Sequence, residues 1–151
     1  MTTTVIVDAN VLVALADARD KWHDTAVALR DALLTAGVQL GFFDCVINES
    51  IGVIGRRAEE QRRSHEFAHL LDELMVLVPE QCITWISSSA QRLYGEVVRL
   101  CRSHHGKLNF NDALMALASQ ELGIGAIVSY DGDFDEVAWL TRIAAPAQIA
   151  N

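Results

Sequence analysis

The stretch GAIVSYD, residues 125–131, is a short β-branched run that ends on an acidic residue. The stretch TVIVD, residues 4–8, has the same form near the other end of the chain. Both have the length and composition of buried strands. Segments with helical periodicity lie between them, and strands that alternate with helices predict βαβ units around a mostly parallel sheet. We therefore expect one domain, residues 1–151, of the α/β class.

The remaining elements have weaker patterns. Strands are expected at QLGFFD (39–44), at CITWI (82–86) and, as a final edge strand, at LTRIA (140–144). The third strand is the hardest to place. Helical patterns, two of them ending near Gly37 and Gly123, occupy residues 11–17, 22–37, 45–58, 59–77, 87–105 and 111–123.

Composition excludes several classes of protein. With 51% hydrophobic residues the chain can bury a substantial core. No apolar run approaches the roughly 20 residues that a membrane span needs, and Asp8 interrupts the first one, so we expect neither a signal peptide nor a membrane segment and predict a cytoplasmic protein. Cys45, Cys82 and Cys101 are odd in number and contain no CxxC pair, which favours buried reduced thiols.

Four acidic side chains crowd the segment that follows residue 130: Asp131, Asp133, Asp135 and Glu136. They repel one another in a chain whose net charge is already -8, and a bound cation would offset that cost. A calcium loop of the EF-hand type does not fit, because Glu136 and Arg142 stand where Gly and Glu are required. A loop that presents carboxylates to Mg²⁺ or Mn²⁺ fits the pattern.

Position in the expected sheet connects this loop with Asp8. In open parallel sheets, ligands bind at the carboxyl ends of the strands, near a switch in strand order. Asp8 and Asp131 both follow strands. If those strands are neighbours, the two carboxylates meet in one crevice.

Two further acids have both a structural and a functional interpretation. Asp112, three residues after Asn109, fits a capping box at a helix start. Glu49 lies away from the centre of the apolar face of its helix, as a solvated residue would. Each becomes functional only if the fold brings it close to the other acids.

Two other enzyme classes fit less well. HEFAH, residues 65–69, matches a zinc-protease motif, but both histidines fall opposite the helix face that Leu70 and Leu74 define. A phosphohydrolase with an aspartate nucleophile would place Asp8 at a strand end, but it expects a second Asp where this chain has Asn10.

Charge bears on possible partners. A sequence pI near 4.9 counts against nucleic acid, because phosphate binding depends on clustered Lys and Arg. Two Arg pairs in GRRAEEQRR (55–63), together with Lys107, would weaken this objection if they flank the acidic site. A solvated helix face explains the same segment equally well.

Taken in order, VIVDANVLVAL, NES, LNFNDALMALASQELG and AIVSYDGDF resemble the successive motifs of the PIN-domain ribonucleases, and within them the VapC-like toxins of bacterial toxin–antitoxin pairs. The resemblance runs from about residue 4 to residue 143. It implies a three-layer α/β/α sandwich fold with a mostly parallel central sheet, and a cluster of acids that holds Mg²⁺ or Mn²⁺. By position, the catalytic and metal-holding residues are Asp8, Glu49, Asp112 and Asp131, with Asp133 as an accessory metal ligand and with Asn10 and Ser129 orienting the carboxylates.

The resemblance also implies a function. It predicts a divalent-metal-dependent endoribonuclease that hydrolyses RNA phosphodiester bonds, acts as the toxin of a toxin–antitoxin pair, forms a homodimer and binds a cognate antitoxin protein. Two alternatives fit the same residues: a non-catalytic PIN-like binding or scaffold module, and a housekeeping RNA-processing nuclease. The sequence does not identify the RNA that is cut, the antitoxin, or the number of metal ions.

Overall fold

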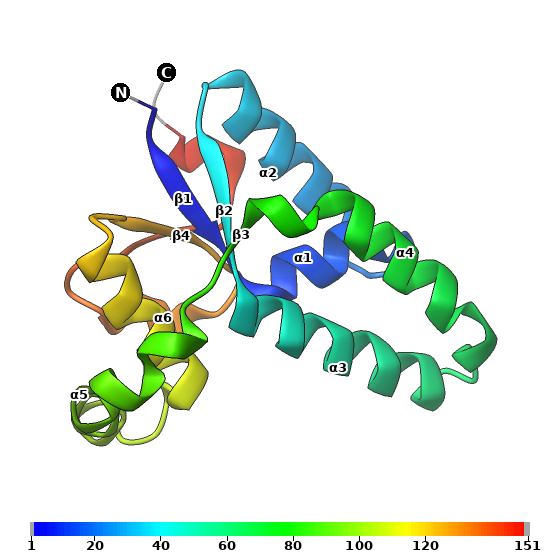
Figure 1. Cartoon of the computed structure of the whole chain (residues 1–151). Coiled ribbons are helices and arrows are strands. Elements are labelled where there is room, and N and C mark those ends of the chain that lie inside the picture. The colour runs from blue at the N-terminus through cyan, green and yellow to red at the C-terminus, as the bar shows by residue number, and fades with distance from the viewer. Residues whose placement is uncertain (1, 150–151) are drawn as a thin grey trace.

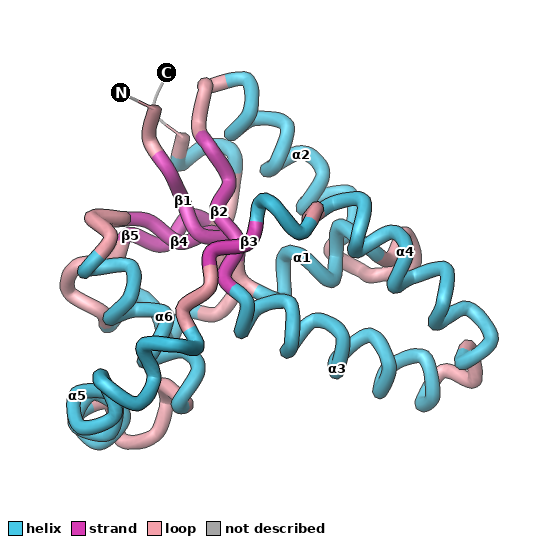
Figure 2. The backbone as a smooth tube through the Cα atoms, viewed as in Figure 1, coloured by secondary structure: helices cyan, strands magenta, loops and turns pink. Residues whose placement is uncertain are grey.

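Five parallel strands form one sheet in the computed structural model, which describes residues 2–149 (Figures 1 and 2). Each neighbouring pair is parallel, and the spatial order is β3-β2-β1-β4-β5. All five expected strands are present, and β5 lies at an edge as predicted. The strands are β1 (Thr4–Val7), β2 (Gln39–Phe43), β3 (Ile83–Thr84), β4 (Ala126–Val128) and β5 (Thr141–Ile143).

Helices cover both faces of this sheet. They are α1 (Ala9–Ala16), α2 (His23–Thr35), α3 (Asp44–Glu60), α4 (Phe67–Leu77), α5 (Ala90–Ser103) and α6 (Phe110–Glu121). From β1 the chain passes through α1 and α2 to β2, and through α3 and α4 to β3. It then crosses back through α5 and α6 to β4, on the other side of β1. Because crossovers are right-handed, this reversal places α1–α4 on one face and α5 and α6 on the other (Figures 1 and 2). The predicted α/β/α sandwich is confirmed.

The reversal of direction also fixes where a ligand would bind. Strand order switches between β1 and β4, which pair in parallel with Val7 opposite Val128. Both strands therefore end at the same edge of the sheet, and the crevice beyond it is the switch point where ligands bind in such folds.

The core is densest around β1 and α1. Val5, Ile6 and Val7 are buried, and so are seven of the eight residues of α1. Helix α1 packs against α2, α3 and α4, which explains why its sequence is apolar on all sides. The residue that joins these two elements, Asp8, is consequently held by rigid structure on both sides.

The helix predicted over residues 59–77 is wrong. Helix α3 continues to Glu60, the chain then turns at Arg62 with a φ of 57°, and α4 begins only at Phe67. His65 therefore lies in a short 3-10 turn, outside α4, and both His65 and His69 are exposed. The HEFAH segment is not a zinc motif on one helix face.

Two predictions from composition have clear outcomes. All three cysteines are free thiols, but only Cys45 is buried, whereas Cys82 is exposed. Burial raises the pKa of the Cys45 thiol to about 12, so this sulfur is unreactive near neutral pH. Among residues 2–149, no helix combines the length and apolar character that a membrane crossing needs.

Candidate active site at the carboxyl edge of the sheet

Asp8 and Ser129 lie side by side where β1 and β4 end. The backbone N–H of Asp8 donates to the carbonyl of Val128 at 2.9 Å, which continues the strand pairing by one residue. The Asp8 side chain then caps α1, accepting from the Ala9 N–H at 2.8 Å. The Ser129 hydroxyl donates to the other carboxylate oxygen of Asp8 at 2.6 Å. Strands β1 and β4 are therefore neighbours, which was the condition for the Asp8 and Asp131 carboxylates to lie in one crevice.

Asn10 and Ser129 connect Asp8 to the loop after β4. The Asn10 amide nitrogen lies 3.4 Å from Asp8 Oδ2 and 3.3 Å from Ser129 Oγ, and Asn10 Oδ1 accepts from the Tyr130 N–H at 3.1 Å. Ser129 Oγ also accepts from the Asp131 N–H at 3.0 Å. These contacts fix the orientation of the Asp8 carboxylate and the path of the loop that carries Asp131.

Asp112 combines a helix-capping role with a place among the other acids. Its side chain accepts from the Asn109 N–H at 3.2 Å, while its own N–H donates to Asn109 Oδ1 at 2.9 Å, so the predicted capping box is confirmed. Asp112 is nonetheless buried, and burial together with the negative charges of Asp8, Glu49 and Asp131 raises its pKa to about 7. The cap thus holds a carboxylate among other carboxylates.

Glu49 is less solvated than its helical position suggested. It is half-buried on α3, and burial, followed by the charges of Asp8 and Asp131, raises its pKa. Arg56, about two turns further along the same face of α3, opposes this shift. The interaction with Asp8 and Asp131 shows that α3 brings Glu49 to the same edge of the sheet.

Asp8 completes a set of four interacting acids. Burial raises its pKa most, the hydrogen bonds from Ser129 and Ala9 oppose the shift, and the charge of Asp131 adds to it. Across residues 2–149, no ion pair includes Asp8, Glu49, Asp112 or Asp131. Within the described part of the protein, the repulsion in this group is therefore not offset by a direct cationic partner.

The set suits a hard divalent cation in its chemistry. Its donors are carboxylate oxygens, which Mg²⁺ and Mn²⁺ prefer. In the described residues, however, no three His, Cys, Asp or Glu side chains are gathered closely enough to hold a metal ion as they stand. The carboxylates interact through their charges from separate elements, and coordination requires them to draw together.

The acidic run after β4 divides into two parts. The Asp133 N–H donates to Asp131 Oδ1 at 2.9 Å, which ties the loop to the site. Asp135 forms an ion pair with Arg142 at 2.9 Å, and Glu136 forms one with Lys107 at 2.9 Å. The crowding seen in the sequence is therefore relieved at Asp135 and Glu136 by ion pairs. Asp131 and Asp133 form no ion pair with residues 2–149, and they interact with Arg142 and Lys107 only through charge at longer range.

Of the basic residues proposed to flank the site and contact RNA, three form ion pairs, whereas Arg56 acts on Glu49 of the site through its charge. Arg57 pairs with Asp20 at 2.7 Å, and Arg63 pairs with Asp17 at 3.0 Å and with Glu66. The Arg57–Asp20 pair ties α3, and the Arg63–Asp17 pair ties the turn after α3, to the connection between α1 and α2. Arg63 is nearly buried and Lys107 is occupied by Glu136, so neither is a free phosphate contact.

Sequence reasoning missed two features beside the site. Asp44 ends the QLGFFD run, but its carboxylate accepts from the N–H groups of Ile86 and Ser87 at 2.8 and 3.2 Å. Burial alone would raise its pKa, yet these hydrogen bonds lower it. The second feature is a stacked pair formed by Trp22 and Tyr130, with ring centroids 5.1 Å apart. No local sequence signal marks this pair, because its two rings come from opposite ends of the chain.

The fold and this edge define an α/β/α protein whose acids gather at a topological switch point. Residues 5–140 match the family model of the PIN domain, and the chain belongs to that family. No curated protein matches it in sequence.

Solved structures share the fold at low identity. The Mycobacterium tuberculosis VapC20, described as a toxin that cleaves the sarcin–ricin loop, is 18% identical with a TM-score of 0.64, over 89% of this chain and 95% of that one. PAE2754 from Pyrobaculum aerophilum is 19% identical with a TM-score of 0.59, over 93% of this chain and 89% of that one.

Proposed function

We propose that this protein is a divalent-metal-dependent endoribonuclease. Asp8, Glu49, Asp112 and Asp131 are its catalytic, metal-holding residues, with Asp133 as an accessory ligand and Mg²⁺ or Mn²⁺ as the cofactor. The observation that carries the proposal is this group of acids, in which burial and neighbouring negative charge raise the pKa of Asp8, Glu49 and Asp112. None of the four acids forms an ion pair with a described residue. Such a group is costly for folding unless a cation neutralises it.

The proposed chemistry follows from what each side chain can do. A bound divalent ion would activate a water molecule and stabilise the negative charge that develops on the phosphate. Ser129 and Asn10 hold the Asp8 carboxylate in one orientation, through hydrogen bonds to Oδ2. Asp112 uses one oxygen for its helix cap and leaves the other free of hydrogen bonds from the described residues. These hydrogen bonds fix the orientation of individual carboxylates, which must still draw together when the ion binds.

Membership of the PIN family and the likeness to VapC20 support an RNA substrate and a toxin role. We propose on the same grounds that the protein acts in a toxin–antitoxin pair, as a homodimer held inactive by a cognate antitoxin. Exposed apolar side chains on α4, Met75 and Val76, are compatible with a protein partner. Light scattering of the purified protein would measure the oligomeric state, and a monomer at micromolar concentration would contradict the dimer.

Incubation with mixed cellular RNA in the presence of Mg²⁺, Mn²⁺ or EDTA tests the nuclease. We expect cleavage with metal, none with EDTA, and none by the Asp8→Asn, Asp112→Asn double variant. Asn keeps the shape of each side chain and can still accept the Ala9 and Asn109 hydrogen bonds. The matched control is Asp31→Asn, Asp72→Asn, which changes the net charge equally at exposed positions away from the site.

The outcomes separate the proposal from its alternatives. Cleavage that the control retains and the site variant loses supports the nuclease, and the fragment ends identify the RNA that is cut. Absence of both metal binding and cleavage would contradict it and favour a non-catalytic binding module.

A further inference from the structure

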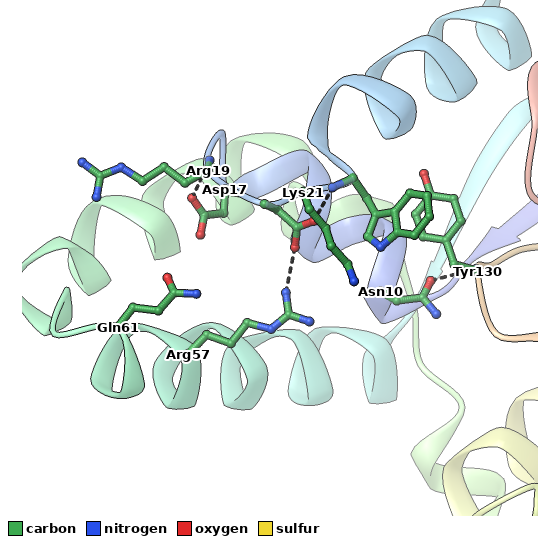
Figure 3. A pocket seen from close by; sticks show the side chains of 9 residues that line it. Asn10, Asp17, Arg19, Lys21, Arg57, Gln61 and Tyr130 are labelled. Carbon is green, nitrogen blue, oxygen red and sulfur yellow. Dashed lines mark hydrogen bonds and ion pairs between the residues drawn. The ribbon is translucent and has the colours of Figure 1, made fainter.

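A cavity of about 430 Å³ lies beside the acidic site, between the α1–α2 connection and α3. Asn10, which bonds to Asp8 and to Ser129, forms part of its wall, together with Tyr130 from the loop after β4 (Figure 3). Lys21 and Arg57 extend their side chains into the space beside Asn10 (Figure 3). One wall of the cavity is therefore a side chain that orients the proposed catalytic carboxylate.

The other notable wall is aromatic. The rings of Trp22 and Tyr130 are stacked, with centroids 5.1 Å apart and planes inclined by 26°. Trp22 nevertheless remains 44% exposed. Its backbone is fixed by a hydrogen bond from its N–H to Asp20 Oδ1 at 2.8 Å, and that of Tyr130 by its N–H to Asn10 at 3.1 Å. An indole held in one orientation with much of its surface open is suited to stacking with another planar group.

The charges in the cavity complement a phosphate. Arg57 is paired with Asp20, so its charge is offset within the protein. Lys21 forms no ion pair with any residue in the range 2–149, and its ammonium lies 5.6 Å from the centre of the Trp22 ring. That cation–π contact is weak at an exposed position, so the ammonium is free to move to an anion beside the ring.

We propose that this cavity binds a nucleobase of single-stranded RNA, which stacks on Trp22 while Lys21 contacts an adjoining phosphate. The inference rests on the proposed function, because Asn10 places the cavity next to the acids that would cut the same strand. The volume suits a small planar group. Stacking accepts any base, so the subsite sets the register of the strand on the enzyme without selecting one base.

The test measures RNA affinity independently of cleavage. Fluorescence anisotropy with a short labelled single-stranded RNA, in EDTA and at low salt, compares the unmodified protein with Trp22→Leu, which removes the aromatic face, and Trp22→Phe, which keeps one. A second probe has the same length and phosphates but lacks bases. Trp85→Leu is the matched control, because Trp85 is more exposed than Trp22 and lines a different cavity.

We expect Trp22→Leu to weaken binding of the RNA by about 5- to 100-fold, from the usual contribution of one stacked base. Binding of the abasic probe should change less than about twofold, and Trp22→Phe should recover most of the loss. Lys21→Gln should weaken both probes, because it removes a phosphate contact. Unchanged RNA affinity in Trp22→Leu, an equal loss with the abasic probe, or an equal loss in Trp85→Leu would overturn the proposal.

Mn²⁺ titration and RNA cleavage distinguish failure of this inference from failure of the proposed function. Trp22→Leu should bind Mn²⁺ as the unmodified protein does. If RNA binding depends on Trp22 but neither cleavage nor Mn²⁺ binding occurs, the base-binding subsite is supported and the proposed nuclease activity is contradicted. If metal-dependent cleavage occurs and Trp22→Leu leaves RNA affinity unchanged, the proposed nuclease activity is supported and the base-binding subsite is contradicted.

Discussion

The carboxylates of this protein fall into two groups with opposite electrostatic surroundings. At the carboxyl edge of the sheet, burial and mutual repulsion raise the pKa of Asp8 and of Asp112. Around the connection between α1 and α2, burial of Asp17 is outweighed by hydrogen bonds from Arg63 and Arg19, and its pKa is lowered. Within residues 2–149, the acids that tie the helices together, Asp17 and Asp20, are paired with arginines, whereas Asp8 and Asp112 at the edge of the sheet form no ion pair.

Asp8 and Asp44 show the same contrast at matched positions. Each follows a strand and opens a helix. Asp44 receives two backbone N–H groups from the segment after β3, so it is a structural anchor. Asp8 instead receives the Ser129 hydroxyl and lies among other acids. The electrostatic surroundings of a strand-ending acid are thus set by the fold and not by its place in the sequence.

Arg63→Met should have the largest effect on stability. The change removes the guanidinium that pairs with Asp17 and Glu66. The Asp17 side chain, which is only 14% exposed, then has a carboxylate without its cationic partner. Breaking a buried ion pair costs about 3–5 kcal/mol, and we expect a value near the lower end because solvent reaches both partners. Urea unfolding measures the loss. Mn²⁺ affinity should not change, and a parallel loss of Mn²⁺ binding would contradict the separation of the two groups.

Asp112→Asn should stabilise the metal-free protein, and more so as the pH rises. The Asp112 carboxyl has a pKa of about 7 in the folded protein against 3.8 ordinarily, so between these values the folded chain keeps a proton that the unfolded chain has released. Raising the pH through this window therefore destabilises the unmodified protein relative to the variant. We expect a difference of about 1–3 kcal/mol at pH 8 that vanishes near pH 4.

Thermal unfolding at several pH values, with and without Mn²⁺, measures this difference. Saturating Mn²⁺ should reverse its sign, because the ion stabilises only the protein that retains the carboxylate. A variant that is less stable than the unmodified protein at pH 8 without metal would show that the helix cap outweighs the repulsion.

Ser129→Ala should weaken the site without destroying it. The hydroxyl bonds to Asp8 at 2.6 Å and accepts from the Asp131 N–H at 3.0 Å, so its removal frees both acids to reorient. Loss of an orienting partner costs about 10- to 100-fold in metal affinity or activity. Calorimetric titration with Mn²⁺ measures the change. Ser103→Ala, at an exposed helix end, is the control, and equal affinities of the two variants would remove Ser129 from the site.

Lys107→Gln should have the smallest effect. Its ion pair with Glu136 joins two side chains that are each about half exposed, at 54% and 47%. Exposed pairs contribute about 0–1 kcal/mol, so we expect a shift of that size in urea unfolding. A loss of unfolding free energy comparable to that of Arg63→Met would contradict the distinction between exposed ion pairs and the less exposed Arg63 pairs.

The sequence predicts this fold well where a local pattern determines structure. The runs before Asp8 and Asp131 are β-branched and apolar, and both form the central strands. Strand β3 has only two residues, too few for a periodic pattern. The break at Arg62 has neither Gly nor Pro to signal it, and Arg63 reaches Asp17 immediately after it.

The candidate site follows the same rule. Strand ends and a helix start identify Asp8, Asp112 and Asp131 in the sequence. The interpretation of Glu49 as a site residue depends on the fold, where α3 brings it close enough for its charge to interact with the other acids. The stacking of Trp22 on Tyr130 joins distant segments and has no local signal at all. The position of Glu49 and the stacking of the two rings both depend on long-range packing, which a single sequence does not reveal.

A Mn²⁺ titration tests the central claim most directly. The unmodified protein should bind Mn²⁺ stoichiometrically, as should the Asp31→Asn, Asp72→Asn control, whereas the Asp8→Asn, Asp112→Asn variant should lose binding while remaining folded. Absence of binding by the unmodified protein, or equal binding by the site variant, would contradict the claim that the acids without ion-pair partners form a cation site.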